Sequence, residues 1–230
     1  PQTLSLIEGS LPLLVEISGA RLTNEFELIF NERKAPEMLR QLGSLGILGA
    51  IHSALPWDDD SIRRYSIGLA NLSLPETTIS PEEKTHMLWC LWLQDIDPEA
   101  LEAIGKRLRL PANLLDWIEQ TRKLQLLLPA LYGLRPSQIT QNLESFHSIP
   151  MRAILASCEN ADFRQILHIY NEKYRHVRPI TTGNDLRALG LPPSPRYEVI
   201  LTALKQAWLD GQIESEREER DLLQRLLEQE

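Results

Sequence analysis

The chain has 230 residues, of which 43% are hydrophobic and 24% are charged, a balance typical of a globular protein with a sizeable core. No stretch approaches the roughly 18 consecutive apolar residues of a membrane span, so a membrane protein is excluded. Only two cysteines are present, which excludes a disulfide framework and a four-cysteine metal site. The first residues lack the pattern of a secretory signal, and we therefore expect a cytoplasmic protein.

The net charge of −8 argues against general affinity for nucleic acid, but the charge is unevenly distributed. Acids and bases counted by segment give −5 for residues 1–60, −1 for 61–150, +2 for 151–213 and −4 for 214–230. The single net-positive segment predicts that any contact with an acidic polymer lies within residues 151–213.

Helix-start signals recur along the whole chain. Each combines a capping side chain or a proline with an apolar run at helical spacing, and no segment alternates with the period of a strand. The sequence therefore predicts an all-α fold, an elongated array of about ten to thirteen short helices. The signals are Ser18 before GARLTNEFELIF, Ser80-Pro81-Glu82-Glu83 before KTHMLWCLWLQ, Asp97-Pro98-Glu99 before ALEAIGKRL, and Pro111 before ANLLDWIEQTRKLQLLL.

Composition breaks divide the array into three regions. They are a neck-like region over 1–58, a helical body over 59–150 and a helical tail over 151–230. The last stretch reads as a charged amphipathic helix that docks one side on the protein. Its apolar stripe consists of Leu222, Leu223, Leu226 and Leu227.

No complete active site is visible in the sequence. The acidic run Asp58-Asp59-Asp60 precedes a helix, so we interpret Asp59 or Asp60 as a cap and not as a magnesium ligand. The five histidines form no metal-binding motif, and there is no nucleophile elbow or phosphate-binding glycine loop. Trp89, Trp92 and Trp117 follow the apolar spacing of helices, which favours core packing over stacking on RNA bases.

Two stretches are more specific. In the first, Ser18 is placed to cap a helix on which Arg21 and Glu25 lie four residues apart and are expected to form an ion pair. In the second, a short helix stops at Gly190 and a proline-rich turn leads into a new helix near Pro195. Such a turn exposes backbone N–H groups to an anion. Arg187 and Arg196 flank it with positive charge.

Together these stretches resemble the carboxyl-terminal part of the class II tRNA nucleotidyltransferase and bacterial poly(A) polymerase family. The first matches a neck motif, through Ile17, Ser18, Arg21, Leu22 and Glu25, continued by Glu32, Pro36, Leu39, Leu42, Gly46, Ile47 and Leu48. The second matches a tail pattern, through Gly183, Asp185, Leu186, Leu189, Gly190, Leu191, Pro193, Pro195, Asp210 and Gly211. Ser194 stands where the family usually has glycine, which affects how closely a phosphate can approach the turn.

The resemblance implies that catalysis and RNA binding belong to different parts of the parent protein. The family's catalytic head has no counterpart in these residues, so we expect a fragment that adds no nucleotides itself and binds tRNA or other RNA for a head lying upstream. Magnesium and ATP or CTP are expected only with that head, and no cofactor in this chain. The resemblance gives Ser18, Arg21 and Glu25 the role of a brace for the nucleotide pocket. The residues expected to bind RNA are Arg187, Gly190, Ser194, Arg196 and Lys205.

Two alternatives stay open from the residues alone. The acidic charge and the scarcity of basic clusters favour a helical protein-interaction scaffold. The proline-rich turn also fits a general nucleic-acid-binding module. The identity of the added nucleotides lies in the absent head and is not encoded here.

Overall fold

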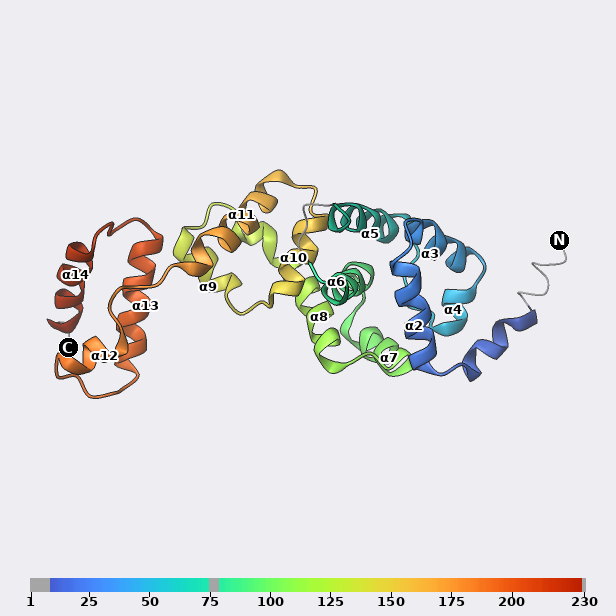
Figure 1. The fold of residues 1–230 in the computed structure, drawn as a ribbon, viewed down its shortest axis with the longest axis horizontal. Helices are drawn as coiled ribbons and strands as arrows, with labels where there is room; N and C mark the ends of the chain where they lie inside the picture. Colours follow the sequence, from blue (N-terminus) through green and yellow to red (C-terminus); the bar gives the residue numbers. More distant parts are fainter. Residues whose placement is uncertain (1–8, 75–78, 229–230) are drawn as a thin grey trace. The chain divides into compact units, whose positions relative to one another are not determined.

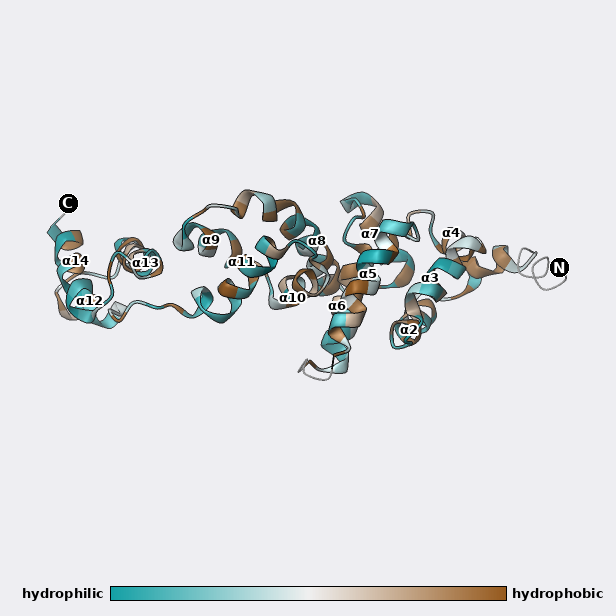
Figure 2. Cartoon of the chain, turned by 90° about the horizontal axis from the view of Figure 1, so that it is seen from above, coloured by the Kyte–Doolittle hydropathy of each residue, from teal (hydrophilic) through white to brown (hydrophobic). Residues whose placement is uncertain are grey.

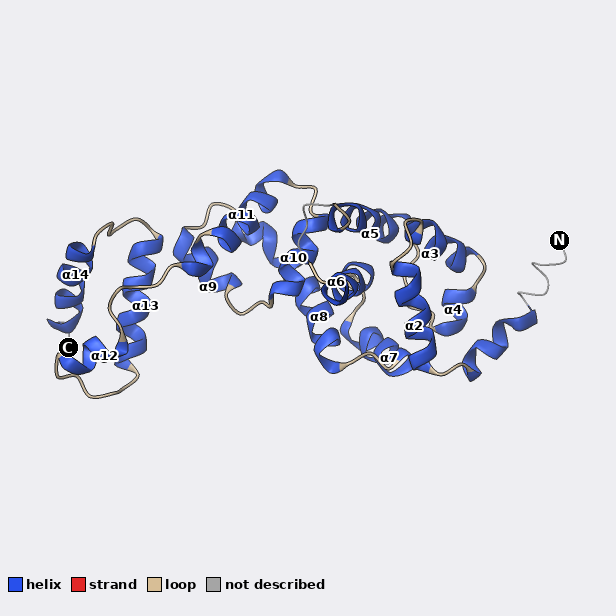
Figure 3. Cartoon of the chain, viewed as in Figure 1, coloured by secondary structure: helices blue, strands red, loops and turns tan. Residues whose placement is uncertain are grey.

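The structure is a computed structural model that describes residues 9–74 and 79–228. Every regular element in those ranges is a helix, as Figure 3 shows, which confirms the all-α prediction. The elements in chain order (Figure 1) are η1 (Leu11–Glu16), α2 (Gly19–Phe30), α3 (Ala35–Ser44), α4 (Ile47–Ile51), α5 (Asp59–Leu72), α6 (Pro81–Leu93), α7 (Pro98–Leu108), α8 (Ala112–Leu127), η2 (Leu128–Leu131), α9 (Pro136–Leu143), α10 (Ser148–Ser157), α11 (Ala161–Glu172), η3 (Tyr174–His176), α12 (Gly183–Ala188), α13 (Arg196–Leu209) and α14 (Glu216–Glu228).

The chain forms two compact units. The first contains the described residues of 1–129 and 146–164, and the second contains those of 130–145 and 165–230. The three regions expected from the sequence, with boundaries after residues 58 and 150, do not coincide with these units. That division into neck, body and tail stays a prediction about modules.

The first unit is built around α6, which contacts α2, α5, α8 and α10 and is seen end-on in Figure 1. Trp89 and Trp92 on α6 are at most 1% exposed and meet the rings of Phe26 and Phe30 on α2. The Phe30 and Trp89 centroids lie 4.9 Å apart in an edge-to-face arrangement, a favourable geometry for aromatic pairs. The prediction that Trp89 and Trp92 belong to the core is confirmed.

Trp117 on α8 is only half-buried, unlike the two tryptophans of α6. Its ring stacks on that of His147, with centroids 4.8 Å apart and an angle of 20° between the planes. Nδ1 of His147 in turn accepts a hydrogen bond from the Ile149 N–H and caps α10. Trp117 therefore packs against the core, as predicted, and its ring also stacks on the residue that caps α10.

Side-chain caps begin the helices at the predicted places. Ser80 forms a reciprocal capping box with Glu83, and Asp97 accepts from the N–H of Ala100. The cap of α5 corrects the sequence interpretation, because it is Asp58 and not Asp59 or Asp60. The carboxylate of Asp58 accepts from the Ser61 N–H at 2.9 Å and from the Ser61 hydroxyl at 2.6 Å.

The second unit has a smaller core, made where α12, α13 and α14 meet. Leu186, Ile200, Leu204 and Leu223 are its buried members. The leucine stripe of α14 packs against them while its other face is hydrophilic, as the teal colour of α14 in Figure 2 indicates. The prediction that the last helix docks through this stripe is confirmed.

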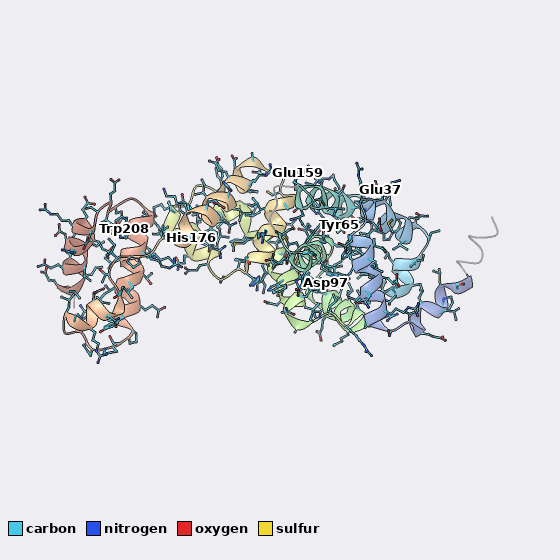
Figure 4. All side chains as sticks on the ribbon, viewed as in Figure 1. Glu37, Tyr65, Asp97, Glu159, His176 and Trp208 are labelled. Atoms are coloured by element: carbon cyan, nitrogen blue, oxygen red, sulfur yellow. The ribbon has the colours of Figure 1, made fainter. Side chains whose placement is uncertain are left out.

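A buried carboxylate closes this small core. Glu219 on α14 is 1% exposed and accepts hydrogen bonds from the backbone N–H groups of Ile180 and Thr181 and from the indole of Trp208 (labelled in Figure 4). Burial alone would raise the pKa of Glu219, but hydrogen bonds from Thr181, Trp208 and Ile180 outweigh it and hold the pKa below its ordinary value. Glu219 therefore fastens the loop before α12 to α13 and α14.

Candidate functional site

The predicted brace lies at the start of α2. The hydroxyl of Ser18 accepts from the Arg21 N–H at 3.4 Å, so Ser18 is the cap that the sequence predicts. Arg21 and Glu25 are both exposed, and among the described residues they form no ion pair with each other or with another side chain. The expected pair along the helix is therefore wrong, and the two charges point outward from α2.

The other side of the same helix start is fixed by α7. The guanidinium of Arg107 donates to the carbonyl oxygens of Ile17 at 3.0 Å and Leu14 at 2.7 Å. The hydroxyl of Thr23 donates to the carbonyl of Leu108 at 2.6 Å. These contacts hold the direction of α2, and hence the direction in which its exposed charges point.

The proline-rich turn has the predicted chain path. α12 ends before Gly190, which has φ +88°, and α13 begins after Pro195. The N–H of Gly190 bonds to the carbonyl of Arg187, and the N–H of Leu191 bonds to that of Leu186. Because three prolines of the turn carry no N–H at all, fewer donors face an anion than the sequence interpretation expects.

Ser194 occupies this turn without backbone strain. Its φ is not positive, so the serine in place of the usual glycine demands no left-handed conformation. Its carbonyl accepts from the Tyr197 N–H at 3.0 Å, while its own N–H has no partner among the described residues. Ser194 therefore leaves one backbone donor open.

The three cations predicted to bind RNA do not converge on the turn. Arg187 on α12 is exposed and, within the described part of the chain, forms no ion pair. The guanidinium of Arg196 donates to the carbonyls of Leu226 and Leu227, where it caps the end of α14. Lys205 lies farther along α13.

Lys205 belongs to a second basic site, which the sequence analysis missed. Its ammonium forms an ion pair with Glu144 at 2.8 Å, beside a polar cavity of about 320 Å³ inside the second unit. Arg175 and Arg178, on and just after η3, line the same cavity. The sequence signal is the run K-Y-R-H-V-R, in which four basic residues, counting histidine, lie within six positions.

Two acids of the tail pattern, Asp185 and Asp210, have architectural roles. Asp185 closes the capping box of α12 by accepting from the N–H and hydroxyl of Thr182, both at 2.7 Å. The Thr182 hydrogen bonds hold the pKa of Asp185 below its ordinary value. Asp210 accepts from the N–H and hydroxyl of Ser137, both at 2.8 Å, and so ties the end of α13 to the start of α9. These two acids of the tail pattern therefore stabilise the fold of the second unit.

A shallow groove of about 690 Å³ lies between α12 and α14 in the second unit. Its lining includes Ile180 and Leu189, which are 52% and 56% exposed. Asp185 and Glu216 also line it. The lining also includes Arg220, which forms an ion pair with Glu216.

Nothing in the described ranges gathers three or more histidine, cysteine or acidic side chains into a group that fits a metal ion. The cysteines are both free thiols. Cys90 is buried, and burial raises its pKa to about 12, whereas Cys158 is only half-buried. No helix in the described residues has the length and apolar character needed to cross a bilayer.

Comparison with known proteins agrees with the family resemblance. A protein family described as "Probable RNA and SrmB- binding site of polymerase A" matches residues 1–57. The A-adding tRNA nucleotidyltransferase of Geobacter sulfurreducens is 25% identical over 241 aligned residues, which cover 97% of this chain and 27% of that protein. The chain thus spans about a quarter of the length of this relative.

Solved structures share the fold. The Thermotoga maritima CCA-adding enzyme, complexed with tRNA-CCA, superposes with a TM-score of 0.73 and 16% identity over 97% of this chain and 54% of that one. An apo form of a CCA-adding enzyme gives a TM-score of 0.76 and 16% identity over 99% of this chain and 54% of its own. At this identity the likeness establishes the fold alone.

Proposed function

Because the chain is a carboxyl-terminal portion of the CCA-adding enzyme and poly(A) polymerase family, we propose that it binds RNA for a template-independent nucleotidyltransferase. The observation that carries the proposal is the match of nearly the whole chain to a tRNA nucleotidyltransferase, with residues 1–57 matching an RNA-binding family. The parent protein adds CCA, part of CCA or A residues to RNA 3′ ends. The RNA held by this portion is tRNA or a similar molecule.

The proposal extends to the partners of the chain. The catalytic head contributes magnesium and ATP or CTP, and this portion supplies none of the groups that hold them. The exposed charges of Arg21 and Glu25 face that head and brace its nucleotide pocket. The assembly works in the cytoplasm, where tRNA 3′ ends are processed.

The brace predicts a separation of activity from stability. In the full-length enzyme, Arg21→Ala and Glu25→Ala should each lower the turnover number by about tenfold, equivalent to about 1.4 kcal/mol of transition-state stabilisation. Because both side chains are exposed and unpaired in this portion, its melting temperature should not change. Asn24→Ala, on the same exposed face of α2, is the matched control and should leave both quantities intact. A Glu25→Ala enzyme with full activity and a less stable α2 would contradict the assignment.

RNA binding by the isolated chain is the direct test of the proposal. Few lysine and arginine side chains are available to contact phosphate, so binding should be weak. The dissociation constant for tRNA should be on the order of 10⁻⁴–10⁻⁶ M at physiological salt and should rise with the salt concentration. Arg187→Glu should weaken the binding of full tRNA, an acceptor minihelix and unstructured RNA alike, because phosphate contacts carry no sequence information. The slope of log K against log salt should become shallower by about 1.

Arg217→Glu makes the same charge change on the acidic helix α14 and is the control. Circular dichroism at each salt concentration verifies that the variants stay folded. Equal affinities and slopes for wild type and Arg187→Glu would remove Arg187 from the binding surface. Absence of any salt-dependent binding by the wild type would refute the RNA-binding function.

One observation favours a second candidate, a protein-interaction module. The groove between α12 and α14 combines exposed Ile180 and Leu189 with polar side chains, a surface that fits a short apolar peptide. The matching family description also includes SrmB binding, for residues 1–57. Protein binding becomes the preferred function if the wild type has no affinity for RNA.

A further inference from the structure

The cavity lined by Arg175, Arg178 and Lys205 carries more positive charge than its surroundings neutralise. Glu144 is the one acidic side chain in the lining, and it pairs with Lys205. Within the described part of the chain, neither Arg175 nor Arg178 forms an ion pair. The two guanidinium groups therefore leave two positive charges without a counter-charge at one cavity.

Hydrogen bonds to nearby residues hold the two arginines in place. Arg175 donates through Nη1 to Oδ1 of Asn171 at 3.2 Å. Arg178 donates through Nη1 to the carbonyls of Arg175 and Val177, both at 2.8 Å. His176 (labelled in Figure 4) bonds through Nε2 to the carbonyl of Asn171 at 3.0 Å. Each guanidinium is thus oriented through one nitrogen and keeps further N–H donors for another acceptor.

The rest of the lining suits the same kind of acceptor. Tyr170 on α11 is 3% exposed, and burial raises the pKa of its hydroxyl, so the phenol keeps its proton and can donate. Thr140 also lines the cavity, but its hydroxyl donates to the carbonyl of Pro136 and so offers no hydrogen to an anion. The lining contains no aliphatic side chain. A small anion with several oxygen atoms matches this set of donors better than an apolar or cationic group does.

We propose that this cavity binds one phosphate group, contacted by Arg175, Arg178 and Lys205. Its source is the backbone of the RNA assigned to this chain, and to that extent the inference rests on the proposed function. A single bound phosphate positions the RNA strand without reading its bases. Free phosphate or pyrophosphate offers the same chemistry, and the experiment separates the two sources.

The test compares two charge-matched double variants of the 230-residue chain. Arg175→Gln with Arg178→Gln should weaken tRNA binding by at least about tenfold, because two charge-assisted hydrogen bonds to one phosphate are lost. Its salt slope should become shallower by about 0.7–0.9, the contribution of one phosphate. Arg217→Gln with Arg225→Gln removes the same charge from α14 and should change neither quantity.

A third variant gives an effect of opposite sign. Glu144→Gln removes the carboxylate that competes for Lys205, so tRNA binding should tighten several-fold. Unchanged affinity in both the arginine pair and Glu144→Gln would overturn the proposal, as would equal losses in the two double variants. Circular dichroism melting verifies that each variant remains folded.

Measuring pyrophosphate binding beside tRNA binding shows whether the cavity or the proposed RNA-binding function is wrong. If tRNA binds but Arg175→Gln with Arg178→Gln binds it equally well, RNA binding stands and the cavity is refuted. If tRNA does not bind, yet millimolar pyrophosphate raises the melting temperature of wild type and not of the arginine pair, the cavity is a phosphate site for a free anion. If neither ligand distinguishes the variants, the cavity binds no phosphate.

Discussion

Replacing Glu219 with alanine should unfold the α12–α14 part of the second unit at neutral pH. The substitution leaves the N–H groups of Ile180 and Thr181 and the indole N–H of Trp208 buried without an acceptor. Each such donor costs about 1–3 kcal/mol, so the total reaches several kcal/mol, a large share of a small domain's stability. Glu219→Gln should lose less stability than Glu219→Ala, because its amide oxygen still accepts a hydrogen bond. It should still be less stable than the wild type, because the new NH₂ group faces a donor.

The same carboxylate predicts how stability depends on pH. Its pKa is lowered in the folded chain, so its contribution is complete above the unfolded value of about 4.3 and is lost as the pH falls through the folded value. Between about pH 5 and 3 the wild type should therefore lose stability more steeply than Glu219→Gln.

The indole resonance of Trp208 is the appropriate probe, because Trp208 is the one tryptophan of the sequence beyond residue 117. Its hydrogen exchange should be slow in the wild type and fast in both Glu219 variants. Asp221→Asn, an exposed change on the same helix, is the control and should keep the wild-type exchange rate and acid slope. Protected exchange in Glu219→Ala would show that the hydrogen bonds of Glu219 do not hold the loop.

Glu219 also illustrates what the sequence could not reveal. Its hydrogen-bond partners Ile180 and Thr181 lie 39 and 38 positions away, and nothing local distinguishes it from the other acids of α14. Caps such as Ser18, Ser80 and Asp97 were predictable because donor and acceptor lie within three residues. Apolar helix faces such as that of Trp89 and Trp92 were also predictable, from their spacing. Polar contacts between residues far apart in the sequence were not.

The candidate site also has parts that the sequence predicts and parts that it does not. The turn at Gly190 and the start of α13 follow from glycine and proline chemistry, and the structure places both as expected. The partners of Arg196 and Lys205 were not predictable, because they lie far away in the sequence. Arg196 bonds to carbonyls of α14, and Lys205 pairs with the carboxylate of Glu144 after α9. The cluster of Arg175 and Arg178 was visible as a basic run, but only folding brings Lys205 to it.

Gly19, inside the predicted brace motif, should tolerate no side chain. A Cβ at this position would overlap the carbonyl oxygen of Arg107 and lie 2.9 Å from the carbonyl carbon of Leu108. Backbone atoms at the end of α7 cannot rotate away as a side chain can. Gly19→Ala should therefore destabilise the first unit by about 1–3 kcal/mol, as overpacking usually does.

Gly49→Ala is the matched control, and its effect should have the opposite sign. Gly49 lies within α4, and a Cβ there would have no atom within 4 Å. Alanine in an unstrained helical position should stabilise by about 0.4–1 kcal/mol, mainly by restricting the unfolded chain. Urea denaturation of both variants measures the two changes, and a stabilising Gly19→Ala would refute the close packing of α2 on α7. Since that packing sets where Arg21 and Glu25 point, Gly19→Ala should also lower the activity of the full-length enzyme while Gly49→Ala leaves it unchanged.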